Sequence, residues 1–84
     1  MRIKLNDKQL VLLKDTLKES SSTHLLSHLE NARGNNPLDL ADSIADDMRN
    51  TVGEKLTIIG FDKNYELTNE GKILEELIDI LYVK

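Results

Sequence analysis

Apolar residues recur every three or four positions over most of this chain, which is the spacing of a helix with one buried face. The last third shows the pattern most fully, in the stretch NEGKILEELIDILYVK. Its apolar face consists of Ile73, Leu74, Leu77, Ile78 and Leu81. Most of its charged positions, among them Glu75 and Asp79, fall on the other side. The pattern predicts a packed helix that presents carboxylates to solvent.

The first half of the chain predicts an extended arm and two short helices. Polar and apolar residues alternate from Arg2 to Leu5, and Asn6 or Asp7 can then cap a helix over about 7–19. The serines at 20–22 interrupt this helix, because serine side chains compete for backbone hydrogen bonds. Ser21 or Ser22 can cap a second, shorter helix, which runs through Ala32 and ends at the turn GNN, 34–36.

A third and longer helix is predicted from Pro37 to about Ile59. Proline suits the first helical position, and Asn36 before it can act as the cap. Asp39 and Asp42 in the opening turns complement the positive end of the helix dipole. The apolar steps that carry this helix are Ala41, Ile44, Ala45, Met48, Val52, Leu56 and Ile59.

Two glycines and a threonine predict how the last two helices meet. Gly53 costs about 1 kcal/mol relative to alanine and predicts a kink or a close helix contact. Gly60 predicts the end of the third helix through a left-handed conformation, and Thr68 caps the fourth. We expect one all-α domain over 1–84, a small four-helix bundle with two short N-terminal helices, two longer antiparallel C-terminal helices and a short N-terminal extended arm.

The same spacing predicts which side chains form the core. The core residues are expected to be Leu10, Leu13, Leu17, Leu26, Leu29, Ile44, Met48, Val52, Leu56, Ile59, Phe61, Leu74, Leu77, Ile78 and Leu81. Further apolar residues lie beside these stripes and could cover a homodimer interface. They are Val11, Leu12, Ile58, Ile80 and Tyr82.

The charge of the chain is uneven along its length. The whole chain carries a net charge of -4, whereas residues 37–84 contain five Lys or Arg and eleven Asp or Glu, a balance of -6. Such a surface repels nucleic acid and membranes and attracts basic proteins. The candidate partner-binding residues are Asp39, Asp42, Asp46, Asp47, Glu75, Glu76 and Asp79. Two other readings are solubility and, for Asp39 and Asp42, service of the helix N-terminus.

No pattern in the chain indicates catalysis, a cofactor or a metal. The chain has no cysteine, which excludes disulfides and four-cysteine zinc sites. His24 and His28 in HLLSH are two ligands without a third, which favours a polar helix face. The acidic stretch after Asp62 resembles a calcium loop, but Leu67 and Ile73 occupy the positions of the required glycine and glutamate. Because nucleophile elbows and phosphate loops are also missing, we expect no enzyme.

Membrane and nucleic-acid functions find little support. Apolar runs are far shorter than the roughly 20 residues that cross a bilayer, and MRIKLNDKQ has no signal-peptide core, so we expect a cytoplasmic protein. A DNA-reading helix should be basic, whereas the third and fourth helices are acidic. The basic first helix leaves a nucleic-acid-binding regulator as a second alternative.

The stretch GFDKNYELTNEGKILEELIDIL has an aromatic-bearing turn that leads into a glutamate-rich helix. In this it resembles the end of the small acidic immunity proteins that protect bacteria from contact-dependent or secreted toxins. The resemblance covers about the last quarter of the chain. It implies a tight complex with a toxin domain, often a nuclease, whose basic cleft the acidic side chains would block. The first hypothesis is therefore an immunity-type inhibitor, and the first alternative is a small self-associating structural or regulatory protein.

Overall fold

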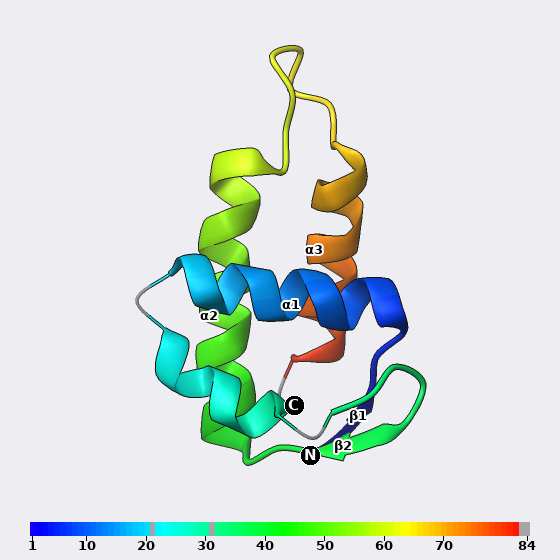
Figure 1. Ribbon diagram of the computed structural model, residues 1–84. Coiled ribbons are helices and arrows are strands. Elements are labelled where there is room, and N and C mark those ends of the chain that lie inside the picture. Colours follow the sequence, from blue (N-terminus) through cyan, green and yellow to red (C-terminus); the bar gives the residue numbers. More distant parts are fainter. Residues whose placement is uncertain (21, 31, 83–84) are drawn as a thin grey trace.

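Helices make up most of the part of the chain that the computed structural model describes, which is residues 1–20, 22–30 and 32–82. The elements in chain order are β1 (Arg2–Lys4), α1 (Asp7–Glu19), the 3-10 helix η1 (Thr23–Leu29), β2 (Pro37–Asp39), α2 (Asp42–Ile59) and α3 (Asn69–Ile80). The helices α2 and α3 lie side by side and antiparallel, and α1 lies across them (Figure 1). The fold is mostly helical, as predicted, but it contains a strand pair that the prediction lacked.

Local signals in the sequence determine α1. The side chain of Asn6 accepts a hydrogen bond from the Gln9 amide at 2.8 Å, and the Gln9 side chain accepts one from the Asn6 amide at 3.0 Å. This reciprocal capping box satisfies two amides that the first turn leaves free. The helix ends at Glu19, before the serines. The predicted bounds of this helix are confirmed.

The second predicted helix is present in a tighter form. Residues 23–29 form a 3-10 helix, with three residues per turn, instead of an α-helix that reaches Ala32. Ser22 precedes it but makes no capping hydrogen bond with its side chain. The alternative cap, Ser21, lies outside the described residues. Two buried leucines, Leu25 and Leu29, attach this short helix to the rest of the protein.

The predicted helix start at Pro37 is wrong. Residues Pro37–Asp39 form a strand that pairs antiparallel with β1, with Ile3 opposite Leu38, and α2 begins only at Asp42. The fixed φ of proline suits an edge strand as well as a first helical turn, so the local signal is ambiguous. The extended path is stabilised by a distant segment, because the Leu40 amide donates to the Met1 carbonyl at 2.8 Å and Leu40 is buried.

The junction between α2 and α3 has the predicted bounds but a different geometry. Thr68 caps α3 by accepting from the Gly71 amide at 2.9 Å, as expected. Gly60 ends α2 with a φ of -71°, so the predicted left-handed conformation is wrong. The close contact expected at Gly53 is also absent, because a Cβ added there would meet nothing within 4 Å. The close approach lies instead between Gly71 and Gly60.

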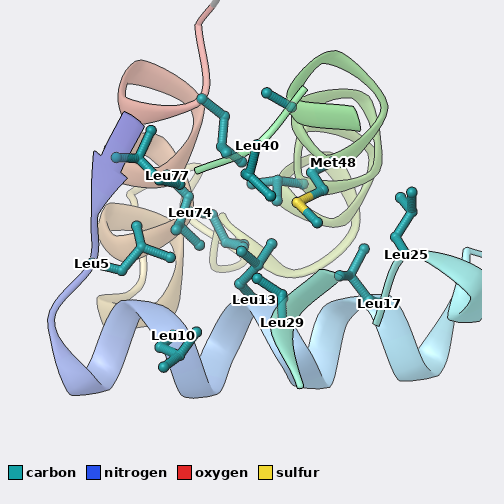
Figure 2. Close-up of a cluster of buried hydrophobic side chains, with 14 residues drawn as sticks. Leu5, Leu10, Leu13, Leu17, Leu25, Leu29, Leu40, Met48, Leu74 and Leu77 are labelled. Atoms are coloured by element: carbon teal, nitrogen blue, oxygen red, sulfur yellow. The ribbon is translucent and has the colours of Figure 1, made fainter. Parts of the chain in front are cut away.

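The core joins α1, α2, α3, η1 and the strand region (Figure 2). Most predicted core residues are buried in it or, like Leu26, Ile44, Leu56, Ile59 and Ile78, packed half-buried against it. Phe61 is the exception: it is 45% exposed, so its placement in the core is wrong. The prediction missed Ile3, Leu5, Leu25, Leu40 and Ala45, which are all buried. Several of these belong to the extended segments, whose burial requires the strand pair.

The apolar residues set aside for an interface divide into two groups. Leu12 and Ile80 are partly buried against the core, whereas Val11, Ile58 and Tyr82 are more than half exposed. Across the described part of the chain, none of the helices has the length and apolar character needed to cross a bilayer.

Candidate protein-binding surface

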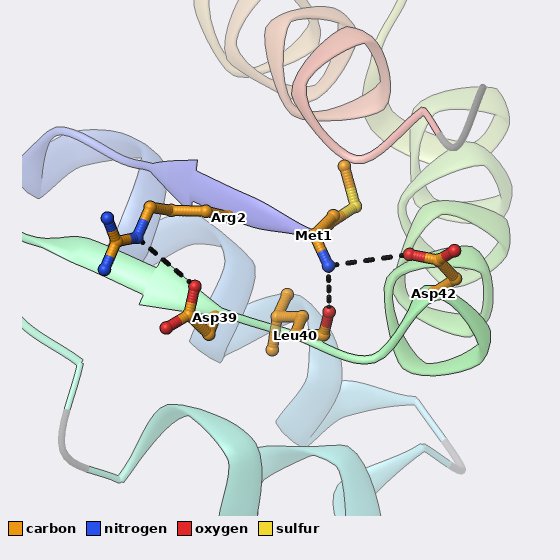
Figure 3. Close-up of polar contacts among 5 residues, drawn as sticks. All are labelled: Met1, Arg2, Asp39, Leu40 and Asp42. Atoms are coloured by element: carbon orange, nitrogen blue, oxygen red, sulfur yellow. Dashed lines mark hydrogen bonds and ion pairs between the residues drawn. The ribbon is translucent and has the colours of Figure 1, made fainter.

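Charges at the start of α2 are paired within the chain. The Asp39 carboxylate lies 3.3 Å from Nε of Arg2, and the Asp42 carboxylate lies 3.5 Å from the amino group of Met1 (Figure 3). That amino group also donates to the Leu40 carbonyl at 2.6 Å. Both carboxylates remain largely exposed, so each pair contributes little stability and a cationic partner could compete for the acid.

Asp46 is the most strongly engaged of the seven predicted acids. Its Oδ1 accepts from Nη2 of Arg49 at 2.5 Å, one turn along the same helix. The guanidinium carbon of Arg49 lies 5.3 Å from the centroid of the Tyr82 ring, which is within the range of a cation–π interaction. Asp46, Arg49 and Tyr82 thus connect the first half of α2 to the residue after the end of α3.

The other four acids point in different directions. Glu76 accepts from Nε2 of Gln9 at 3.0 Å, so it turns toward α1. Glu75 and Asp79 stand four residues apart on α3 and therefore share another face of that helix. Asp47, Glu75 and Asp79 are exposed and form no ion pair among the described residues. The structure thus leaves three of the seven predicted acids without an internal partner, and the sequence does not distinguish these three.

A groove of about 500 Å³ runs along α1 and was not predicted. Its lining residues on α1 are Asp7, Lys8, Val11, Leu12, Asp15, Thr16 and Glu19. Lys55 of α2 and Glu70 and Ile73 of α3 complete it. The floor therefore includes apolar side chains, and both walls carry acids.

A smaller hollow of about 300 Å³ continues this groove toward α2. The two hollows share Thr16, Glu19 and Lys55, and Glu19 forms an ion pair with Lys55. Glu54 and the exposed Ile58 line only the second hollow. The ion pair thus lies at the junction of the two hollows.

The two histidines lie on η1 and are both exposed. With three residues per turn, a separation of four residues places His24 and His28 about 120° apart around the helix. Among the described residues, no group of three or more His, Asp or Glu side chains could hold a metal ion. The histidine spacing therefore loses the shared face that it would have on an α-helix.

The supposed calcium loop forms a tight turn. The Asp62 carboxylate accepts from the Asn64 amide at 2.8 Å and from the Glu66 amide at 3.1 Å, and Phe61 pairs with Leu67 across the turn. Tyr65 has a φ of 62° and its side chain is 88% exposed. The turn therefore holds an aromatic ring in solvent, with Asp62 committed to the backbone.

The groove was missed because its walls come from three helices, and only the exposed position of Val11 hinted at it. Comparisons of this chain with protein-family models, curated proteins and solved structures found no match.

Proposed function

We propose that this protein is a non-enzymatic module that binds a partner protein with a basic surface. The observation that carries the proposal is the exposure of Asp47, Glu75 and Asp79 without an internal cation among the described residues. Because unpaired carboxylates keep their full charge, they attract and orient a cationic partner during encounter. Asp39, Asp42, Asp46 and Glu76 contribute to the same field and can exchange their internal contacts for contacts with the partner.

Charge alone gives steering more than affinity, so a tight complex also needs an apolar anchor. Tyr82 fits this role, because its ring is 53% exposed and is held by Arg49 next to Asp46. Asp79 lies one helical turn before it. An aromatic anchor flanked by acids is a combination that binds basic protein surfaces.

The finer proposal is that the partner is a bacterial toxin domain, that the protein acts as its immunity-type inhibitor, and that the complex forms in the cytoplasm. Support comes from the acidic residues of α2 and α3 and from the resemblance of the last quarter of the chain to immunity proteins. Its test is protection: expression of this chain should relieve the growth arrest that the purified partner's gene causes in the same host. Growth arrest that continues with both proteins present would reject toxin neutralisation while leaving partner binding intact.

The experiment that tests partner binding compares two charge-reversed proteins. The tagged chain is purified from its host at moderate salt, and any stoichiometric companion is identified by mass spectrometry and then purified. Calorimetry should show that the double variant Asp47→Lys, Asp79→Lys binds this companion at least about tenfold more weakly than the unaltered chain. The control is Glu30→Lys, Glu66→Lys, which makes the same change of charge at exposed sites on other elements. Equal losses in both variants, or unchanged affinity in both, would contradict the assignment of the surface.

Self-association is a second candidate, favoured by the exposure of Val11, Ile58 and Tyr82. Exposed apolar side chains gain free energy when a second copy covers them. Light scattering over a range of concentrations measures this directly. A monomer at the highest concentration would rule it out.

A further inference from the structure

We propose that the groove along α1 binds an amphipathic, basic helix of a partner protein. This adds a second surface to the proposed function and rests on its premise that the partner is basic. The apolar face of the incoming helix would contact Val11, Leu12 and Ile73. Its lysines and arginines would lie against the acids on either side.

The shape of the groove fits a helix. The lining residues of α1 form two adjacent rows with a spacing of four residues, one row being Asp7, Val11, Asp15 and Glu19, and the other Lys8, Leu12 and Thr16. Rows of this spacing form the ridges between which the side chains of another helix pack. The rows extend over the whole of α1, whose 13 residues span about 20 Å. A partner helix of three to four turns would therefore fill the groove.

The floor of the groove supplies the apolar contact. Val11 is 58% exposed, whereas Leu12 and Ile73 are half-buried and packed against the core. A residue such as Val11, with both features of an anchor point, stays in water unless a partner covers it. Burial of apolar area yields roughly 25 cal/mol for each Å², so even a few contacts on this floor favour binding.

The charge of the groove selects a basic partner. Across both hollows the lining acids are Asp7, Asp15, Glu19, Glu54 and Glu70, against the cations Lys8 and Lys55. Five acids minus two cations leave a charge of -3. Since Glu19 is already paired with Lys55, the carboxylates of Asp15, Glu54 and Glu70 are the ones that incoming cations would meet.

The same charges argue against a second copy of this chain as the occupant. Its helix α2 carries four acids and two cations, and α3 carries four acids and one lysine. Both would meet an acidic groove with like charge, which costs binding free energy. A helix from a different, basic protein satisfies the charge and the apolar floor together.

The test uses a displayed library of helical peptides of about 18 residues with randomised faces, selected on the purified protein. Selection should enrich peptides with apolar residues at i, i+3, i+4 and i+7 and with lysine or arginine beside them. The variant Val11→Lys, Asp15→Lys should bind these peptides at least about tenfold more weakly. The matched control is Asp47→Lys, Asp79→Lys, which alters the other surface and should bind them normally.

Chemical shifts of backbone amides locate the bound peptide. Changes confined to α1, Lys55 and the first turns of α3 support the groove. Changes centred on Asp47 and Asp79 would overturn the groove but keep the proposed function, since they would place a basic ligand on the other surface. Overturning results are also the absence of enriched peptides, enrichment without basic residues, or a dimer of this chain that occupies the groove. Unfolding by urea, followed by circular dichroism, confirms that every variant is folded.

Discussion

Gly71 and Gly53 both lie inside helices, but only Gly71 lies against another backbone. A Cβ added at Gly71 would overlap the carbonyl oxygen of Gly60 and lie 2.9 Å from its Cα. The absence of a side chain there lets the start of α3 approach the end of α2. At Gly53 an added Cβ would meet nothing, so that glycine carries only the entropic cost of a flexible residue in a helix.

We expect opposite effects when each of these glycines is replaced by alanine. Gly71→Ala should lower the free energy of unfolding by about 1 to 3 kcal/mol, because the backbone atoms it meets cannot move aside easily. Gly53→Ala should raise it by about 0.5 to 1 kcal/mol. Urea unfolding monitored by circular dichroism measures both. Effects of the same sign would show that the contact between the two glycines is not close.

Tyr65 provides a second prediction at the residue scale. A non-glycine residue with positive φ costs roughly 1 to 3 kcal/mol, and the exposed ring of Tyr65 recovers little by burial. We therefore expect Tyr65→Gly to raise the free energy of unfolding by about 1 kcal/mol. Asn64→Gly, at a neighbouring position without positive φ, serves as the control and should be neutral or destabilising. A loss of stability in Tyr65→Gly would mean that the ring contributes contacts in the folded state.

At the scale of elements, the pairing of β1 with β2 decides where α2 begins. Ile3 and Leu5 on one side and Leu40 on the other are buried in the core, and they bring the N-terminal segment over the ends of α2 and α3. The exposed residues of the same strands, such as Arg2 and Asp39, interact only at the surface. The stability of the strand pair therefore lies in its inward-facing side chains.

Leu40→Ala tests this account. Deleting a buried leucine side chain should lower the free energy of unfolding by about 2 to 4 kcal/mol. Asp39→Ala, one residue earlier, should change it by less than about 0.5 kcal/mol, because its ion pair is exposed. Thermal unfolding of the two variants compares them. Similar small effects in both would indicate that this segment does not pack on the core.

The whole molecule combines helices with acidic faces and few internal cations to balance them. Charges on separate elements, such as Asp47 on α2 and Asp79 on α3, act together over about 10 Å at low salt. The groove on α1 adds acids of its own. The field of the molecule is thus a property of the fold, since it depends on which carboxylates are already paired.

Salt should weaken the complex with a basic partner. Between about 0.1 M and about 1 M NaCl the Debye length falls from about 10 Å to about 3 Å, so charge steering is lost. We expect the dissociation constant to rise about tenfold or more, chiefly through a slower association rate. Surface plasmon resonance separates the two rates. A complex whose association rate does not respond to salt would be held by apolar contacts alone.

The sequence by itself determined α1, the end of α2 and the start of α3. These depend on residues within one or two turns of each other, as in the capping box of Asn6 and Gln9 and the cap of Thr68. It also determined most of the core, because helical spacing places residues such as Leu13, Leu17 and Leu74 on inner faces.

Only the tertiary structure decided the strand at Pro37, the exposure of Phe61 and the distribution of the acids. Pro37 suits a helix or a strand, and the choice depends on a partner strand more than 30 positions away. Asp46 and Asp47 are adjacent in sequence, yet only Asp46 meets a cation among the described residues. The groove likewise requires three helices to meet. Features of this kind depend on contacts between distant segments, which no local pattern contains.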